Sequence, residues 1–253
     1  IVSAVIVGSV IFGGIKRFGA IMEKLIPVLS AVYIIGCAAV IIINISEIPA
    51  AFSLIFKQAF NIKSIGFGGG AGILTAMSWG FKRGIFSNEA GLGSSVMIHS
   101  STSQNNAHNQ GLWAMLQVFL DTIVMCTLTA LCVIVTGAQG SGLSEENIAV
   151  FAFSSAFGGY AGAFVSIAVF FFALCTAAGW SVFGVKCSVY LFGQKSRKPY
   201  LILFIMATFG GAVIQSGLVW GLSDLFNGLM AVPNLIAMLF LANHVKNNNQ
   251  PFT

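Results

Sequence analysis

The sequence predicts an all-α polytopic membrane protein, because it is too apolar for a soluble fold and its apolar residues are grouped into long runs. Of the 253 residues, 57% are hydrophobic and 8% are charged, and the mean hydropathy is +0.92. A soluble domain carries roughly 25% charged residues. The runs reach about 20 residues, the length of a helix that crosses the hydrocarbon core of a bilayer. A soluble globular protein is therefore excluded.

The apolar runs give the expected spans in chain order. Residues 1–13 would form a helix about 20 Å long against the roughly 30 Å of a hydrocarbon core, so we expect a fragment that begins within a span. Five further runs are long enough to cross completely, namely residues 26–46, 112–137, 160–192, 200–219 and 221–243.

The stretch 65–100 differs from the other runs. It begins as GFGGGAGILTAMSW, is interrupted by GFKRGIFSNE, and resumes as AGLGSSVMIHS. A continuous helix would place Lys82, Arg83 and Glu89 in lipid, at a few kcal/mol each on insertion scales. We therefore expect a discontinuous helix, made of two half-helices joined by unwound backbone.

The basic residues predict the orientation in the membrane. With Lys82 and Arg83 set aside as intramembrane residues, one side receives only Lys57 and Lys63. The other side receives Lys16, Arg17, Lys24, Lys186, Lys195, Arg197, Lys198 and Lys246. The positive-inside rule then places the loop near residue 196 and the C-terminus in the cytoplasm. Because the basic residues lie between spans, the net charge of +5 does not indicate a nucleic-acid partner.

Two segments then face the outside, residues 47–60 and 138–159. The second is too polar at its start to span, and we expect an amphipathic helix on the membrane surface. No soluble domain is expected.

The break in the stretch 65–100 is the strongest candidate for a binding site. Unwound backbone exposes N–H groups at a helix start and carbonyls at a helix end, which can hold an anionic group or a bare cation. The candidates are Ile85, Phe86, Ser87 and Asn88. Ser87 or Asn88 would cap the second half-helix, whose amides could bind a substrate carboxylate. The alternative is an ordinary cytoplasmic loop anchored by its basic residues.

Two further acidic residues are candidates. Asp121 lies within a span, with Gln117 one turn before it on the same helix face. An intramembrane carboxylate indicates an ion path or a partner for Lys82 or Arg83, and the alternative is a structural polar contact. Glu89, in the first turn of the expected second half-helix, would interact with the positive end of the helix dipole.

Thr176 and Trp180 are four residues apart and share a helix face. They would place a hydroxyl one turn from an aromatic ring that could close over a small ligand. The alternative is a packing aromatic and a threonine bonded to its own helix. The sequence contains no nucleophile–base constellation, phosphate loop, metal motif or organic-cofactor motif, so we expect no enzyme.

Two segments resemble a known family. They are GGGAGILTAMSWGFKRGIFSNEAGLGSS, residues 68–95, and ALCTAAGWSVFG, residues 173–184. They resemble the alanine or glycine:cation symporters, which are sodium-coupled amino-acid carriers of bacteria and archaea. The resemblance implies a leucine-transporter-type fold with two inverted five-helix repeats, each opening with a helix broken at the substrate. It implies that residues 1–46 end the first repeat, that residues 65–243 form the second, and that the N-terminal half of the protein is missing.

The resemblance also implies sodium-coupled symport of a small neutral amino acid, alanine or glycine, by alternating access across the cell (inner) membrane. It implies that Ser87 and Asn88 face the substrate in the unwound segment, that Thr176 and Trp180 form a pocket wall, and that the Thr176 hydroxyl lies near a sodium site. The alternative is an intramembrane enzyme or a non-transporting membrane subunit that uses Asp121 and Glu89.

The basic-residue asymmetry predicts which loops react with an impermeant thiol reagent. A cysteine introduced at Ser196 should be labelled only after the membrane is opened, whereas a cysteine at Ser144 should be labelled in intact cells. The protein without an introduced cysteine is the control, because it gives the background labelling of the native cysteines. The opposite labelling pattern would show that the predicted topology is inverted.

Overall fold

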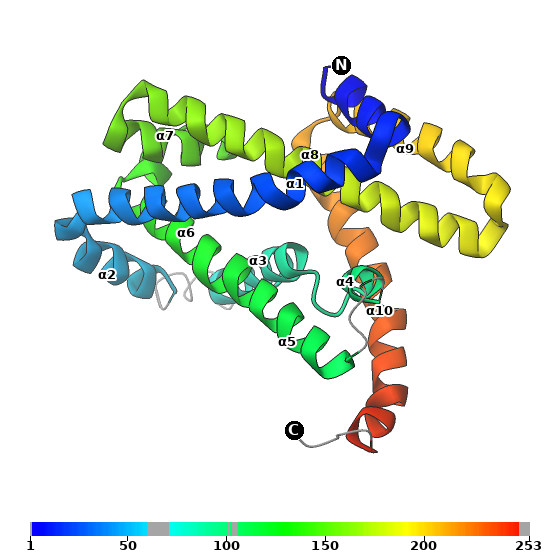
Figure 1. Cartoon of the computed structure of the whole chain (residues 1–253). Coiled ribbons are helices and arrows are strands. Elements are labelled where there is room, and N and C mark those ends of the chain that lie inside the picture. The colour runs from blue at the N-terminus through cyan, green and yellow to red at the C-terminus, as the bar shows by residue number, and fades with distance from the viewer. Residues whose placement is uncertain (1, 60–70, 101, 103–105, 248–253) are drawn as a thin grey trace. The chain divides into compact units, whose positions relative to one another are not determined.

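The computed structural model describes residues 2–59, 71–100, 102 and 106–247, and it is helical without a strand in these ranges. The chain forms two compact units, whose boundaries along the sequence fall at 73/74, 122/123 and 213/214. The first unit contains α1 (Val2–Ile43), α2 (Ile48–Ala59), α6 (Cys126–Val135), α7 (Glu145–Phe157), α8 (Gly159–Phe192) and α9 (Arg197–Gly211). The second unit contains most of α3 (Ala71–Asn88), together with α4 (Ser94–His99), α5 (Ala107–Val118) and α10 (Ser216–Asn247) (Figure 1).

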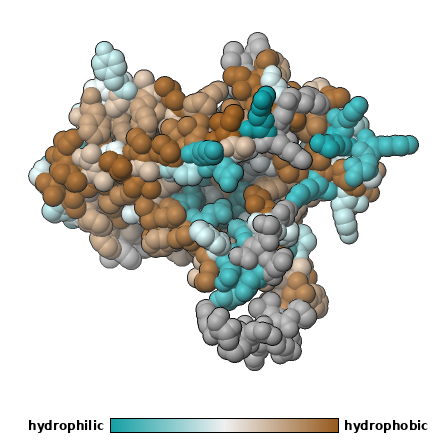
Figure 2. All heavy atoms as spheres, in the orientation of Figure 1, coloured by the Kyte–Doolittle hydropathy of each residue, from teal (hydrophilic) through white to brown (hydrophobic). Residues whose placement is uncertain are grey.

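Four stretches of helix in the described ranges are long and apolar enough to cross a membrane: 17–43, 107–135, 159–192 and 216–242. The expected spans 26–46, 112–137, 160–192 and 221–243 correspond to them. Hydrophobic side chains cover much of the face shown in Figure 2, as expected for helices that contact lipid. The protein is therefore a multi-pass membrane protein.

Helix α1 is continuous, so the expected separation of the runs 1–13 and 26–46 into two spans is wrong. Arg17 and Lys24 lie within the helix, because lysine, arginine and glutamate are good helix formers and a polar segment alone does not end a helix. At 1.5 Å per residue, α1 is about 60 Å long, roughly twice the thickness of a hydrocarbon core. The part that is apolar enough to cross is Arg17–Ile43.

Helix α7 lies in the segment expected to form a surface helix, but one of its faces is packed into the first unit. Phe153 is 2% exposed, and its ring stacks on Tyr33 of α1 with 5.5 Å between centroids. The Tyr33 hydroxyl shares a hydrogen bond of 2.9 Å with Oγ1 of Thr129 on α6. Gly162 of α8 allows close contact with Ser154 of α7. With 13 residues, α7 is also too short to span, as expected, and its position at the membrane surface stays a prediction.

The boundary between the last two helices lies earlier in the sequence than expected. Helix α9 ends at Gly211 and α10 begins at Ser216, whereas the apolar runs placed the boundary near residue 220. The apolar residues Val213 and Ile214 lie in the turn itself, so hydropathy does not reveal it. With 15 residues, α9 is also shorter than a complete span.

The stretch 65–100 contains two helices, α3 and α4, separated by a turn. Its expected beginning, residues 65–70, and Lys63 lie outside the described residues. Expected span 112–137 contains a seven-residue π-helix, η3 (Phe119–Met125), between α5 and α6. Such i→i+5 turns are rare and frequently occur at functional sites.

Candidate functional site

The four candidate residues Ile85–Asn88 form the last turn of α3. The helix continues through Gly84, and the Glu89 N–H still bonds to the Ile85 carbonyl at 2.9 Å. Asn88 then accepts a hydrogen bond from the Ala90 N–H at its Oδ1, at 2.9 Å. The expectation that Ser87 or Asn88 caps the second half-helix is therefore wrong, because both residues end the first helix.

The turn Glu89–Gly93 separates α3 from α4. Its backbone is left-handed at Glu89 (φ 53°), Gly91 (φ 80°) and Gly93 (φ 84°). Glu89 is the one non-glycine residue in the described ranges with a positive φ, a conformation that is unfavourable for a residue with a Cβ atom. Its Oε2 accepts a hydrogen bond of 2.7 Å from Oγ of Ser94, the fully buried first residue of α4. Glu89 therefore ties the turn to α4 from outside the helix, not from its first turn.

Helix α10 holds the same turn from the other side. The Asn234 Nδ2 donates to the Gly91 carbonyl at 3.0 Å. A Cβ atom on Gly93 would lie 2.9 Å from the Asn234 Oδ1, closer than real Cβ atoms approach a neighbour. Both the left-handed backbone and this contact require glycine at position 93.

Ser87 and Asp121, predicted as parts of two separate sites, are in direct contact. The Ser87 Oγ donates a hydrogen bond to Oδ2 of Asp121, which lies in η3 and is half-buried. Thr122 Oγ1 donates to the same oxygen at 3.4 Å. Gln117 is exposed on α5, and its side chain forms no hydrogen bond within the described chain.

Asp224 of α10, which was not among the predicted site residues, is the partner of Lys82 and Arg83. Arg83 Nη2 donates to its Oδ1 at 2.6 Å and to its Oδ2 at 2.9 Å, and Lys82 Nζ lies 3.9 Å from Oδ2. The proposed pairing of Asp121 with Lys82 or Arg83 is therefore wrong. The available signal was the lone carboxylate near the start of the run 221–243, which by itself indicates a polar or ionic contact.

Three aromatic rings surround the guanidinium of Arg83. Its Cζ lies 4.5 Å from the ring centroid of Trp220, 5.3 Å from that of Trp79 and 5.6 Å from that of Phe86. The Arg83 Nε is buried without a hydrogen-bond partner in the part of the chain that the structure describes. Cation–π contact and the Asp224 carboxylate together stabilise this charge.

Thr176 and Trp180 belong to α8 in the first unit, whereas Ser87 and Asn88 belong to the second. The Thr176 hydroxyl donates to the Phe172 carbonyl of its own helix at 2.9 Å, so its oxygen keeps lone pairs for another partner. Trp180 is half-buried and contacts Phe183 edge-on, with 5.6 Å between centroids. These contacts agree with the alternative in which Trp180 is a packing aromatic and Thr176 is bonded to its own helix.

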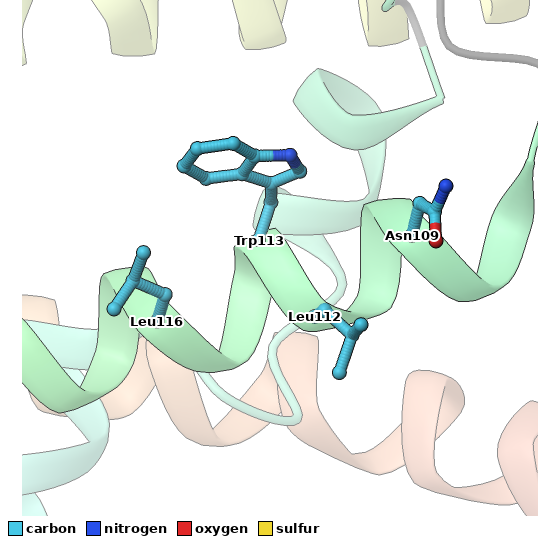
Figure 3. Close-up of a pocket in the computed structure, with 4 residues that line it drawn as sticks. All are labelled: Asn109, Leu112, Trp113 and Leu116. Carbon is cyan, nitrogen blue, oxygen red and sulfur yellow. The ribbon is translucent and has the colours of Figure 1, made fainter.

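Two pockets lie elsewhere. One, of about 480 Å³, lies between α1 and α8 and is lined by Phe18, Gly19, Met22, Glu23, Ile26, Pro27, Cys175, Ala178, Gly179 and Val182. The other, of about 290 Å³, lies beside α5 and is lined by Asn109, Leu112, Trp113 and Leu116 (Figure 3). In Figure 3 the Trp113 ring stands out from the helix, and 61% of this side chain is exposed. Neither pocket is lined by a predicted site residue.

Polar and charged side chains that meet between long apolar helices are typical of membrane proteins that move ions or polar solutes. A family model described as the sodium:alanine symporter family matches residues 1–253. The chain belongs to the sodium:alanine symporter family, which confirms the resemblance drawn from residues 68–95 and 173–184. The members of this family are transporters and not enzymes.

Several named relatives match nearly the whole chain. It is 40% identical to the sodium/alanine symporter AgcS of Methanococcus maripaludis over 99% of this chain and 55% of AgcS. It is 36% identical to the probable sodium/glutamine symporter GlnT of Bacillus subtilis over 94% of this chain and 50% of GlnT. It is 32% identical to a sodium/proton-dependent alanine carrier protein of a Bacillus species over 93% of this chain and 57% of that protein. The chain spans about half the length of these relatives.

The geometry of the turn predicts that Gly93→Ala destabilises the protein. The left-handed backbone costs about 1 to 2 kcal/mol for a residue with a Cβ atom, and the contact with Asn234 adds to this. Gly111→Ala, in a helix with open space around the new Cβ, should leave the melting temperature unchanged or raise it.

The double variant Gly93→Ala with Asn234→Ala removes the steric contact but keeps the left-handed backbone. It should therefore be less stable than Asn234→Ala alone by only the backbone part of the cost. Equal melting temperatures for Gly93→Ala and Gly111→Ala would contradict the structure of the turn.

Proposed function

We propose that the native protein is a secondary active transporter that couples sodium to the symport of a small neutral amino acid, alanine or glycine. The family match over residues 1–253 carries this proposal, and relatives named as sodium-dependent alanine carriers support it. We place it in the inner membrane of a bacterial or archaeal cell, with a cytoplasmic C-terminus and alternating access. Sodium is the coupling ion, and no organic cofactor or covalent step is proposed.

The proposed substrate region is the last turn of α3, with Ile85, Phe86, Ser87 and Asn88. The Ile85 carbonyl accepts from the Glu89 N–H, but the carbonyls that follow it at a helix end lack intrahelical partners, and the helix dipole is negative at this end. Positive charge is therefore favoured here. We propose that the substrate ammonium or a sodium ion lies at this helix end, which reverses the expectation of a carboxylate bound by amides.

Asp121 is the proposed carboxylate of the ion path. Its contact with the Ser87 hydroxyl brings two oxygen ligands together beside the end of α3. Transporters of this general kind bind sodium with carbonyls at the ends of interrupted helices, and a carboxylate adds the negative charge that a bare cation needs. Gln117, in the turn before η3, belongs to the same proposed path.

Thr176 and Trp180 are proposed as the wall of the substrate pocket on α8. The Trp180 ring would limit the size of the substrate side chain by steric exclusion. The Thr176 oxygen has lone pairs left after its bond to Phe172, so it can contribute to a sodium site. The probable sodium/glutamine symporter among the relatives makes glutamine the informative larger competitor.

Uptake into liposomes that contain the native protein tests the ion path. An inward sodium gradient should drive alanine uptake, and potassium in its place should not. Asp121→Asn should raise the sodium concentration for half-maximal uptake by about tenfold or more, because it removes the negative charge but keeps the shape. Alanine uptake by the native protein that does not depend on sodium would contradict the proposed function.

Substitutions on α8 distinguish a pocket wall from packing. Trp180→Leu should admit valine, leucine or glutamine as competitors of alanine uptake, because steric exclusion is lost. Thr176→Val keeps the shape without the hydroxyl and should weaken sodium or substrate binding by about 1 to 3 kcal/mol. Trp113→Leu, at the exposed ring on α5, is the control. An unchanged competition profile and sodium dependence would remove both residues from the site.

A further inference from the structure

Helix α10 presents one partly buried stripe, and its polar members point to a further binding residue. Asp224, Asn227, Ala231 and Asn234 are spaced three or four residues apart, which places them on one face of the helix. All four are partly buried, whereas Leu225, Phe226, Gly228, Leu229, Val232 and Pro233 are exposed. The stripe is therefore the face of α10 that is turned toward the rest of the second unit.

Two members of the stripe form hydrogen bonds to the segment that carries the proposed substrate region. Asp224 receives the two hydrogen bonds from Arg83, and Asn234 donates to the Gly91 carbonyl. Residues 83–91 are thus attached to α10 at both ends. The segment between these attachments contains Ile85–Asn88.

Asn227 lies on α10 between the two attachments, and its carboxamide forms no hydrogen bond within the residues that the structure describes. A partly buried amide in an apolar helix loses free energy unless a donor and an acceptor satisfy it. The other carboxamide of the stripe, on Asn234, donates from its Nδ2 to the Gly91 carbonyl. Asn227 therefore has a free donor and a free acceptor on the face that the segment 83–91 follows.

We propose that Asn227 is a substrate-binding residue whose carboxamide hydrogen-bonds to the charged groups of a zwitterionic amino acid held against the last turn of α3. This inference rests on the proposed function and deepens it, because it adds α10 to the substrate site. A carboxamide can accept from the ammonium and donate to the carboxylate, so it suits a zwitterion better than a metal ion alone. Because the carboxamide is uncharged, we do not propose it as a sodium ligand, and its removal should not change the sodium dependence.

The test measures alanine uptake and alanine binding by the native protein and its variants. Asn227→Ala should raise the KM for alanine by about 10- to 100-fold, the loss expected for a hydrogen bond to a charged group, with maximal uptake nearly unchanged. It should also reduce the rise in melting temperature caused by alanine, while the sodium concentration for half-maximal uptake stays as in the native protein. Asn227→Gln, which keeps the carboxamide, should recover part of the affinity.

Leu229→Ala and Gly228→Ala, at exposed positions on the same turns, are the matched controls and should leave the KM unchanged. An Asn227→Ala variant with a lower melting temperature but an unchanged KM would show a structural role and overturn the inference. If the native protein transports alanine with sodium and neither Asn227 variant alters KM or alanine-induced stabilisation, the inference alone fails. If the native protein neither transports nor binds alanine, the proposed function fails, and the inference fails with it.

Discussion

The ion pair between Arg83 and Asp224 is the interaction on which the second unit depends. A guanidinium among apolar helices is costly unless a carboxylate neutralises it, and two short hydrogen bonds and three aromatic rings achieve this. Because Arg83 lies one turn before Ser87, the ion pair also fixes where the end of α3 lies along α10. The turn that follows α3 then reaches Asn234.

The turn between α3 and α4 is held by side chains from three elements, and its backbone conformation follows from them. Asn88 bonds to the Ala90 amide, Glu89 to the Ser94 hydroxyl, and Asn234 to the Gly91 carbonyl. These contacts offset the unfavourable left-handed conformation of Glu89, which ends the helix at a residue that is not glycine. A polar, firmly held turn at the end of a helix is therefore built from the part of the sequence that most resembles the family.

Hydropathy predicts the helices that cross the membrane because the bilayer requires long apolar stretches, and α8 matches its expected range to within one residue. Local polarity does not predict where a helix ends, so α1 continues through Arg17 and Lys24, and α3 continues through Gly84. The partner of Arg83 could not be read from the sequence because Asp224 lies 141 residues away. The π-helix also gives no signal, since FLDTIVM contains neither glycine nor proline.

The pairing of Arg83 with Asp224 also determines what Asp121 can bind. Asp121 lies beside the C-terminal end of α3, where the helix dipole is itself negative, so two negative features meet in an apolar setting. A hydroxyl donor from Ser87 compensates only part of that charge. Arg83 lies on α3, one turn before Ser87, and it is already bound by Asp224. The described chain forms no ion pair to Asp121. The negative charge left on Asp121 is the reason why this carboxylate is the proposed ligand for the coupling ion.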